Sequence, residues 1–413
     1  MVDEKLKKRN FIAMTIEGSF FFSGQAFIDY NAVIPVFIFA YTQSVLLAGL
    51  ATTIYFVASI SMQTIVGPYL RRIRNVPFYI SRIMLIFRPL PFLMIPVLFA
   101  GFSPWTTISI FLVIYVMMYA GHGMIQIAWT DLFGRTIQPE KRGILFGYQL
   151  LFGGLGALLA GFIVKSALDH PGFTDDQRFA LIFGCSAITF TISAISMFFT
   201  RDLPRKIEVS KISPLQYYRK LPHYLRQNKA FRRLAVVRIF ASVAIMVAPF
   251  VILFGDKMMQ LEPTDVSTLV FLQISGNLIG GIIWGKVSSR FGNHRVIFTS
   301  QIFSFSIALF AVLLFIIRPA QLPAAILWPL VLANGINMGN WVGFINYTID
   351  IVDEEERTIY LLINNLITFP FAFLPFLAGV IAQTFGYLPI FIISGLAASA
   401  SLYLSRLLKR TVH

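Results

Sequence analysis

The chain has 413 residues, of which 57% are hydrophobic and only 13% are charged. A soluble globular protein carries about 25% charged residues, so this composition excludes a soluble multidomain enzyme and indicates a membrane protein with many spans. The formal net charge of +15 would also suit a nucleic-acid-binding protein, and the positions of the basic residues decide between the two. The single cysteine, Cys185, cannot form an internal disulfide.

Twelve long apolar segments, separated by polar breaks, follow one another along the chain. A helix needs about 20 apolar residues to cross a bilayer. With approximate ends, the segments run from Phe11 to Phe39, Val45 to Val66, Val76 to Ala100, Trp105 to Thr130, Gly143 to Val164, Phe179 to Phe199, Leu234 to Phe254, Val266 to Val287, Val296 to Ile317, Ala324 to Ile349, Ile359 to Ala382 and Leu388 to Leu408. The sequence therefore predicts an all-α membrane protein with twelve transmembrane helices and both termini on one side.

The basic residues lie mainly on one side of this topology. Of the 34 Lys and Arg residues, 27 fall in the loops and ends on the side of the termini. Cytoplasmic loops retain Lys and Arg, so we expect a multi-pass protein of the cell membrane with both termini in the cytoplasm. Topology and anionic lipid then explain the net charge, which argues against binding to nucleic acid.

A polar segment of residues 201–233, with ten basic and two acidic residues, divides the chain into two similar halves. We expect an N-terminal six-helix bundle in residues 1–200, a basic cytoplasmic linker in 201–233 and a C-terminal six-helix bundle in 234–413. Within the linker, residues 215–225 are either an amphipathic helix on the lipid headgroups or part of a solvated connection.

The two halves share features at a nearly fixed offset, which indicates an internal repeat. Trp129 in the fourth span is matched by Trp341 in the tenth, 212 residues later. The loop that begins at Gly67 is matched by the loop that begins at Gly285, at an offset of 218. Two pseudo-symmetric six-helix bundles with repeated loops are the organisation of many secondary transporters.

These two loops resemble a pattern of the major facilitator superfamily, which reads Gly, three residues, Asp, Arg, any residue, Gly and then basic residues. Residues 285–295 (GKVSSRFGNHR) match it with Ser289 at the acidic position, whereas residues 67–74 (GPYLRRIR) have Arg71 there. The resemblance implies an alternating-access fold in which spans one, four, seven and ten line a central cavity. It also places the glycine motif of proton antiporters at Gly156-Ala157, although close helix packing explains these small residues as well.

Polar side chains on the fourth and tenth spans form the predicted substrate site, because polar groups at membrane depth usually face a partner, a cavity or a substrate. His122, Gln126 and Trp129 follow at i, i+4 and i+7 and share one helix face. The tenth span contributes Asn334, Asn337, Met338 and Trp341, of which Asn334, Met338 and Trp341 are expected to form the corresponding i, i+4, i+7 face. Directional hydrogen bonds and flat indole surfaces suit an amphipathic or polyhydroxylated solute. The alternative is that these groups only bond across neighbouring helices.

Glu17 and Arg238 are the predicted proton-coupling residues. They lie about 10 Å into the first and seventh spans by the 1.5 Å rise of a helix, at an offset of 221 residues. A titratable carboxylate at membrane depth can carry a proton, and the alternative is a purely structural ion pair. Arg88 in the third span is followed by Pro89 and Pro91, and it either meets backbone carbonyls that the prolines free or binds an anion.

The resemblance also predicts an ion-pair gate on the cytoplasmic side, where the loop after span two meets the start of span eleven in the other half. That contact would join Arg71, Arg72 and Arg74 to Asp353, Glu354, Glu355 and Glu356. Its mirror image would join Asp131 and Glu140 to Arg290 and Arg295. Several exposed pairs together can bias two states that differ by a few kcal/mol. The alternative is a solvated acidic loop.

The sequence carries no enzyme signature: it lacks a His-Glu-x-x-His motif, a cysteine cluster, a phosphate-binding loop and a Gly-x-Ser-x-Gly motif. We therefore expect no catalysis, metal or cofactor. The first prediction is a monomeric secondary transporter that exports an amphipathic small molecule, coupled to protons, through the lipid bilayer. The alternative is uptake of a sugar-like or other polar metabolite with protons or another coupling ion. A hypothesis of another class is a membrane receptor or assembly subunit that moves no solute.

Overall fold

The computed structural model describes residues 2–66, 69, 73, 75–202, 221–317, 323–352 and 357–409, and every regular element in them is helical. The all-α fold predicted from the sequence is confirmed for these residues. Their contacts divide them into two units. The first unit holds the described residues of 2–29, 40–42 and 54–202, and the second holds those of 30–39, 43–53 and 221–409.

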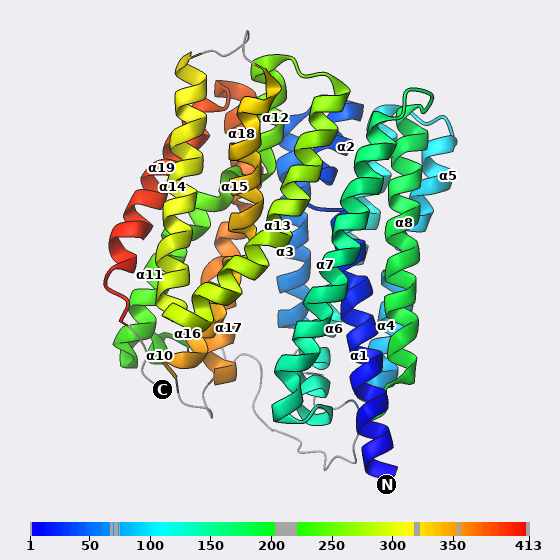
Figure 1. Cartoon of the computed structure of the whole chain (residues 1–413), viewed down its shortest axis with the longest axis vertical. Coiled ribbons are helices and arrows are strands. Elements are labelled where there is room, and N and C mark those ends of the chain that lie inside the picture. Colours follow the sequence, from blue (N-terminus) through cyan, green and yellow to red (C-terminus); the bar gives the residue numbers. More distant parts are fainter. Residues whose placement is uncertain are drawn as a thin grey trace. The chain divides into compact units, whose positions relative to one another are not determined.

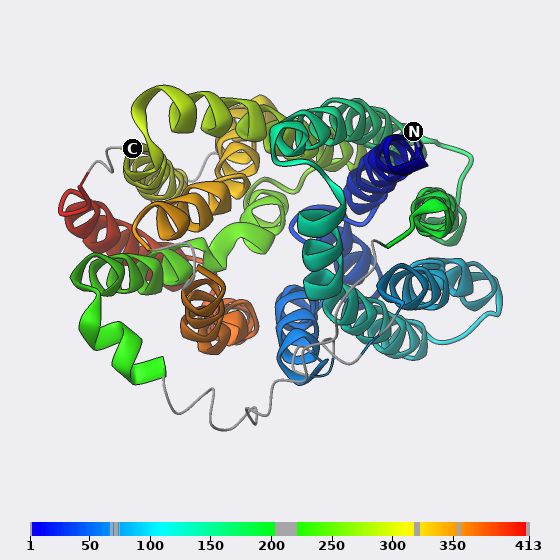
Figure 2. The ribbon, with the colours of Figure 1, turned by 90° about the horizontal axis from the view of Figure 1, so that it is seen from below.

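The first unit is built around its first helix. In chain order it contains α1 (Val2–Phe27), most of α3 (Val45–Val66), α4 (Val76–Phe87), η2 (Leu90–Leu93), α5 (Met94–Phe99), α6 (Pro104–Thr136), α7 (Pro139–Asp169), α8 (Asp175–Ser196) and η3 (Met197–Phe199). α1 packs against both α7 and α8 (Figure 1, Figure 2). Side-chain caps begin three of these helices: Asn75 accepts the Phe78 N–H at 3.1 Å, Ser103 accepts the Thr106 N–H at 3.2 Å and Thr174 accepts the Gln177 N–H at 3.4 Å.

The second unit contains the helices of the C-terminal half together with most of the short apolar helix α2 (Val33–Thr42). In chain order the others are α10 (Leu221–Gln227), α11 (Lys229–Ala244), η4 (Ile245–Phe250), α12 (Val251–Met259), α13 (Pro263–Phe291), α14 (Asn293–Ile317), η5 (Ala324–Leu327), α15 (Trp328–Met338), α16 (Trp341–Asp350), α17 (Arg357–Thr368), η7 (Phe369–Phe373), α18 (Leu374–Phe385) and α19 (Leu388–Ser405). α13 packs closely against α15, and α14 packs against α19 (Figure 1).

Ten helices of the described chain, counted across short 3-10 turns, are long and apolar enough to cross a membrane. They correspond to ten of the twelve predicted spans. The first and tenth spans are each interrupted, since α1 ends at Phe27 before α2 begins at Val33, and α15 ends at Met338 before α16 begins at Trp341. The polar start of α1 and the two breaks explain why the first and tenth predicted spans do not form single apolar helices long enough to cross a membrane.

The break in the tenth span has a clear local cause. The indole Nε1 of Trp284 on α13 donates to the carbonyl of Ile336 at 2.7 Å, so this carbonyl is engaged from outside the helix. The turn that follows is tightened: the N–H of Gly339 bonds to Ile336 at 3.4 Å and that of Asn340 bonds to Asn337 at 3.2 Å. A Cβ atom at position 339 would lie 3.0 Å from the Trp284 ring, and glycine leaves room for the indole. Side-chain insertion of this kind is a recognised source of kinks.

Small residues allow α13 and α15 to approach each other closely. A Cβ atom added at Gly280 would lie 2.2 Å from the carbonyl oxygen of Ile336, which is backbone and cannot move aside cheaply. At the adjacent Gly281, a Cβ atom would meet nothing within 4 Å. Close backbone approach through glycine is the usual way in which membrane helices associate.

We expect Gly280→Ala to destabilise the second unit and Gly281→Ala to leave it unchanged or more stable. Each substitution replaces one glycine of α13 by alanine, and this change by itself stabilises a helix by about 1 kcal/mol. Only the first forces α13 and α15 apart. Melting temperatures of the purified variants in detergent provide the measurement. Equal melting temperatures for the two variants would contradict this account of the contact.

Candidate functional site

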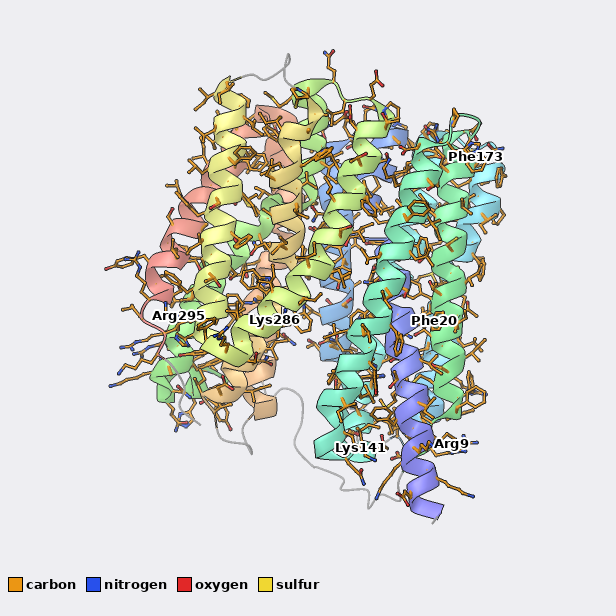
Figure 3. All side chains as sticks on the ribbon, in the orientation of Figure 1. Arg9, Phe20, Lys141, Phe173, Lys286 and Arg295 are labelled. Atoms are coloured by element: carbon orange, nitrogen blue, oxygen red, sulfur yellow. The ribbon has the colours of Figure 1, made fainter. Side chains whose placement is uncertain are left out.

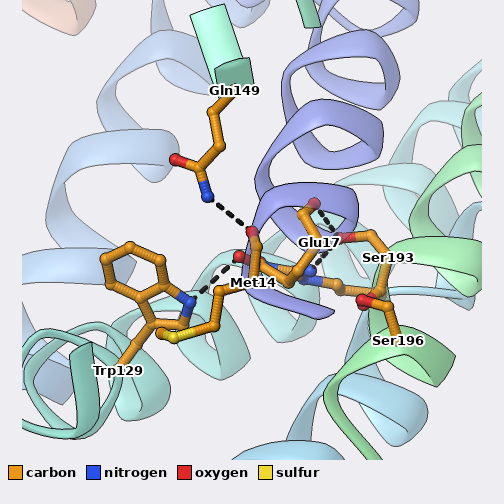
Figure 4. A network of polar contacts seen from close by, with 7 residues as sticks. Met14, Glu17, Trp129, Gln149, Ser193 and Ser196 are labelled. Atoms are coloured by element: carbon orange, nitrogen blue, oxygen red, sulfur yellow. Dashed lines mark hydrogen bonds and ion pairs between the residues drawn. The ribbon is translucent and has the colours of Figure 1, made fainter. Parts of the chain in front are cut away.

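A buried carboxylate, Glu17 on α1, lies at the centre of a polar network in the first unit (Figure 4). Its side chain is only 4% exposed. One carboxylate oxygen, Oε1, lies 2.7 Å from Nη2 of Arg88, and the other, Oε2, accepts the indole N–H of Trp129 at 2.9 Å. Glu17 is therefore shared between a charged partner at the end of α4 and a neutral partner on α6.

Further contacts hold this network in place. Ser193 on α8 donates its hydroxyl to the carbonyl of Glu17 at 2.6 Å and accepts a hydrogen bond from Nη1 of Arg88. The guanidinium of Arg88 also lies over the ring of Phe21, with its central carbon 4.8 Å from the ring centroid. Gln149 on α7 donates to the carbonyl of Met14 at 2.6 Å, one turn before Glu17 (Figure 4). Four helices thus position one carboxylate.

The partner of Arg88 differs from what the sequence indicated. Pro89 and Pro91 end α4 at Phe87 and lead into η2, as their missing N–H groups and fixed φ require. The guanidinium does not turn to the freed carbonyls of this segment; its described hydrogen bonds go to Glu17 and Ser193. An opposite charge outcompetes a neutral carbonyl as a partner for a buried cation. The ion pair considered for Glu17 therefore forms with Arg88.

The predicted face of α6 lies beside this network. The ring of His122 is stacked on Phe21, with centroids 5.2 Å apart and planes only 4° from parallel. Gln126 is exposed and accepts a hydrogen bond from Gln63 on α3. Trp129, which bonds to Glu17, is also stacked on Phe133 at 5.3 Å. The face of α6 that carries His122, Gln126 and Trp129 therefore runs from the buried carboxylate, which Trp129 contacts, to an exposed amide at Gln126.

The corresponding residues of the second unit are bonded differently. Asn334 is buried and donates to the carbonyl of Ala248 at 3.1 Å and to Oε1 of Gln273 at 3.2 Å. Asn337, also buried, donates to the hydroxyl of Ser304 at 2.8 Å. These contacts match the alternative of bonding across neighbouring helices. Sequence spacing alone could not distinguish a substrate site from bonds between helices, because it does not show how a helix is rotated about its axis.

Met338 and Trp341 stand on opposite sides of the break in the tenth span. The sulfur of Met338 accepts a hydrogen bond from the amide of Asn31 at 3.0 Å. Trp341 begins α16, is 51% exposed and donates no hydrogen bond to any residue that the structure describes. The i, i+4, i+7 face predicted for Asn334, Met338 and Trp341 is wrong, because it requires one continuous helix.

Arg238 on α11 is the second predicted coupling residue. Its guanidinium carbon lies 4.3 Å from the ring centroid of Phe344 on α16, in a cation–π contact. Within the described residues, no carboxylate forms an ion pair with Arg238. Glu17 and Arg238 belong to different units, and each is accommodated within its own unit, one by a salt bridge and the other by an aromatic ring.

A model of the family described as MFS/sugar transport protein matches residues 77–356 of this sequence. The chain belongs to this family. The membership confirms the resemblance to the major facilitator superfamily that the two repeated loops indicated. As an MFS/sugar transport protein the chain is a multi-pass membrane protein of a transporter family and not a member of an enzyme family.

Solved structures of transporters share the fold over almost the whole chain. A D-xylose-proton symporter has a TM-score of 0.73 at 13% identity, covering 98% of this chain and 99% of that chain. A mutant of the nucleoside transporter NupG has a TM-score of 0.68 at 11% identity, and the match covers 98% of this chain and 100% of that chain. A bacterial homologue of the human lysosomal transporter Spinster, inward-facing and occupied, has 0.65 at 13% identity, covering 98% and 97%. These likenesses confirm the twelve-helix fold. A comparison with curated proteins finds no match.

Most of the predicted gate lies outside the described residues, namely Arg71, Arg72, Arg74, Asp353, Glu354, Glu355 and Glu356. Glu140 lies in the first turn of α7, but its side chain is also outside the described part. Asp131, Arg290 and Arg295 are exposed at helix ends. The gate remains a prediction for this MFS/sugar transport protein.

The second-half family loop is anchored by residues that the sequence analysis did not select. Ser288 donates to the amide oxygen of Asn293 at 2.6 Å, and the amide nitrogen of Asn293 donates to Asp350 at 2.7 Å. Gly292 between them has a positive φ of 88°, which favours glycine. Asp350, at the end of α16, thus provides an acidic group for a loop in which Ser289 replaces the family Asp.

Gly156 of α7 has a packing role in the first unit. A Cβ atom at Gly156 would lie 1.8 Å from the hydroxyl of Ser23 on α1. This contact supports close packing, one of the two explanations given for the Gly156-Ala157 pair.

We expect a strong energetic coupling between Glu17 and Arg88. Removing one partner leaves an uncompensated buried charge, which costs about 3–5 kcal/mol of stability, whereas removing both relieves it. The variants Glu17→Gln, Arg88→Gln and their combination form a double-mutant cycle that unfolding of the purified protein in detergent can measure. The double variant should be more stable than at least one single variant. Additive losses would contradict the matched ion pair.

Proposed function

We propose that this MFS/sugar transport protein is a proton-coupled secondary transporter that takes up a small polyhydroxylated, sugar-like solute. The observation that carries the proposal is the division of the Glu17 carboxylate between Arg88 and Trp129. Protonation of Glu17 would remove the charge that holds Arg88 and change the hydrogen bond to Trp129. Protonation of Glu17 would thus change a hydrogen bond on the face of α6 that also carries His122 and Gln126.

The chemistry of that face favours a polar solute. Gln126 is exposed and its amide, like that of Gln63, offers both donor and acceptor groups to hydroxyls. The stacked rings of His122 and Phe21, and of Trp129 and Phe133, provide flat apolar surface. Directional polar groups beside aromatic faces suit the alternating polar and apolar faces of a sugar ring. The family description and the fold shared with a sugar-proton symporter support the same class.

Uptake of a sugar-like solute, the alternative to the first prediction, thus replaces export of an amphipathic compound as the favoured function. The 42 Phe and 13 Met residues of the sequence could form adaptable apolar walls for an exported amphipathic compound, but such residues also suit lipid-facing helices. The buried network supports proton coupling, and the family description and the fold shared with a D-xylose-proton symporter support uptake of the solute with the proton. We further propose that the protein acts as a monomer in the cell membrane, with both termini in the cytoplasm as the distribution of Lys and Arg predicts. In the proposed cycle the predicted N-terminal and C-terminal halves, joined by the linker of residues 201–233, expose the solute alternately to either side.

Glu17→Gln should separate solute exchange from proton coupling. The purified protein is reconstituted into liposomes, a panel of labelled sugars is tested, and an inward proton gradient is imposed with and without a protonophore. The wild type should accumulate its solute only with the gradient. Glu17→Gln should retain exchange of external for internal solute but lose accumulation, because the amide cannot carry the proton.

Glu4→Gln is the matched control, since Glu4 is an exposed carboxylate on the same helix, and it should accumulate solute as the wild type does. Unchanged gradient-driven accumulation by Glu17→Gln would remove Glu17 from the mechanism. Proton-driven exit instead of entry would favour efflux. No flux of any tested solute, together with solute binding, would favour the receptor hypothesis.

Trp129→Phe should weaken coupled uptake while it preserves the aromatic stack on Phe133. The substitution replaces the indole by a smaller phenyl ring, which cannot donate the N–H that Glu17 accepts, and a hydrogen bond to a charged group contributes about 1.5–3 kcal/mol. We therefore expect gradient-driven uptake to fall by about tenfold or more. Trp105→Phe is the control, because Trp105 lies in the first turn of the same helix and is exposed. Equal uptake by both variants would contradict a role for the Trp129 hydrogen bond.

A further inference from the structure

A groove of about 530 Å³ runs between α1 and α8 on the first unit. It lies beside the network around Glu17, since Ser196, which lines the groove, donates to the carbonyl of Ser193 at 2.8 Å. Its two ends differ in chemistry. Lys5, Lys8 and Arg9 line it at the start of α1, and Figure 3 shows Arg9 near that end of the helix. Further along, its walls are apolar side chains, among them Ile12, Ile16, Ile192, Ile195 and Phe199. The groove thus has a cationic end and a hydrocarbon wall.

The order of residues on α1 creates this polarity. Positions 5, 8, 9, 12 and 16 follow at helical spacing and lie on one stripe of the helix. The change from cation to isoleucine occurs between Arg9 and Ile12, which is a rise of about 4.5 Å at 1.5 Å per residue. Ile12 is 48% exposed and Ile195 is 46% exposed, so the apolar wall faces outward from the unit. Such surface in a membrane protein is suited to acyl chains.

Hydrogen bonds hold the two sides of the groove at a fixed separation. Asn10 is buried, its amide nitrogen donates to the carbonyl of Arg201 at 2.8 Å, and its amide oxygen accepts the N–H of Arg201 at 2.9 Å. This reciprocal pair joins α1 to the residues that follow η3, beside the cationic end. Two turns further on, Ser193 of α8 donates to the carbonyl of Glu17 at 2.6 Å. The groove is therefore already formed before any occupant enters.

The charge at the cationic end has no counterpart inside the described unit. Lys5, Lys8 and Arg9 form no ion pair with any described residue. The nearest acidic residues along the two chain segments are Glu4 and Asp202, and neither lines the groove. Three neighbouring cations repel one another, and an anion with several acceptor oxygens relieves this repulsion. Basic pockets beside membrane helices bind lipid headgroups by the same electrostatics.

We propose that the groove binds one anionic glycerophospholipid, with its phosphate among Lys5, Lys8 and Arg9 and an acyl chain along the isoleucine wall. With the predicted orientation, this lipid belongs to the cytoplasmic leaflet. The inference does not depend on which solute the protein transports, so the two proposals can fail separately.

The test compares anionic with zwitterionic lipid on the purified full-length protein. Phosphatidylglycerol should raise the melting temperature of the wild type in detergent, and native mass spectrometry should detect bound lipid. Phosphatidylcholine and inorganic phosphate at equal concentrations should do neither. A rise with inorganic phosphate alone would show an ion site and overturn the lipid as occupant.

The variant K5Q/K8Q/R9Q should bind phosphatidylglycerol at least tenfold more weakly. Its matched control is K229Q/R232Q/R233Q, which removes three exposed cations with the same spacing from the start of α11. The control should respond to the lipid as the wild type does. Equally weakened phosphatidylglycerol binding by both triple variants would show that net charge alone determines binding and would overturn the proposed site.

A second variant, Ile195→Trp, fills the groove without changing any charge. It should lose the bound lipid in native mass spectrometry while its elution profile and unliganded melting temperature stay those of the wild type. Retention of the lipid by Ile195→Trp would show that the acyl chain lies elsewhere and would overturn the proposal.

Discussion

A carboxylate and a guanidinium remain charged at membrane depth only when they compensate each other, and the pair of Glu17 and Arg88 imposes this condition on the first unit. The desolvation of each group is costly, so the pair persists only with good geometry and with further hydrogen bonds. Ser193 supplies one of these bonds and Trp129 supplies another. The rotation of α1, α4, α6 and α8 about their axes must satisfy all of them together.

The same pair links structure to the proposed transport cycle. An ion-paired carboxylate can work as a switch, because one proton neutralises it and weakens the ion pair. Trp129 extends this event to α6, where the polar face ends at the exposed Gln126. The second unit has no comparable pair among its described residues, since its buried amides are bonded to neighbouring helices and Arg238 rests on Phe344. The two units therefore differ in their polar chemistry.

Sequence patterns could predict the twelve-helix fold because long apolar segments and loop charges depend on the membrane alone. They also located Glu17, Trp129 and the family loops. They could not assign Arg88 to Glu17, because a contact across 71 residues depends on how two helices are rotated. The face expected for the tenth span failed for a related reason: Trp284, 52 residues earlier than Ile336, captures a backbone carbonyl there. Proline-free breaks caused by a neighbouring helix leave no signature in the broken segment itself.

The division into units has a mechanical consequence. Residues 30–39 and 43–53 group with the C-terminal half, whereas 40–42 and 54–66 group with the N-terminal half. The polypeptide therefore passes from one unit to the other near residues 29, 39, 42 and 53, well before the basic segment in the middle of the chain. Proteolytic cleavage within that central segment would leave the two units covalently tethered. Any rigid-body rotation between them must be absorbed by backbone torsions at these crossings, among them the unwound residues 28–32 and Gln43 with its φ of 54°.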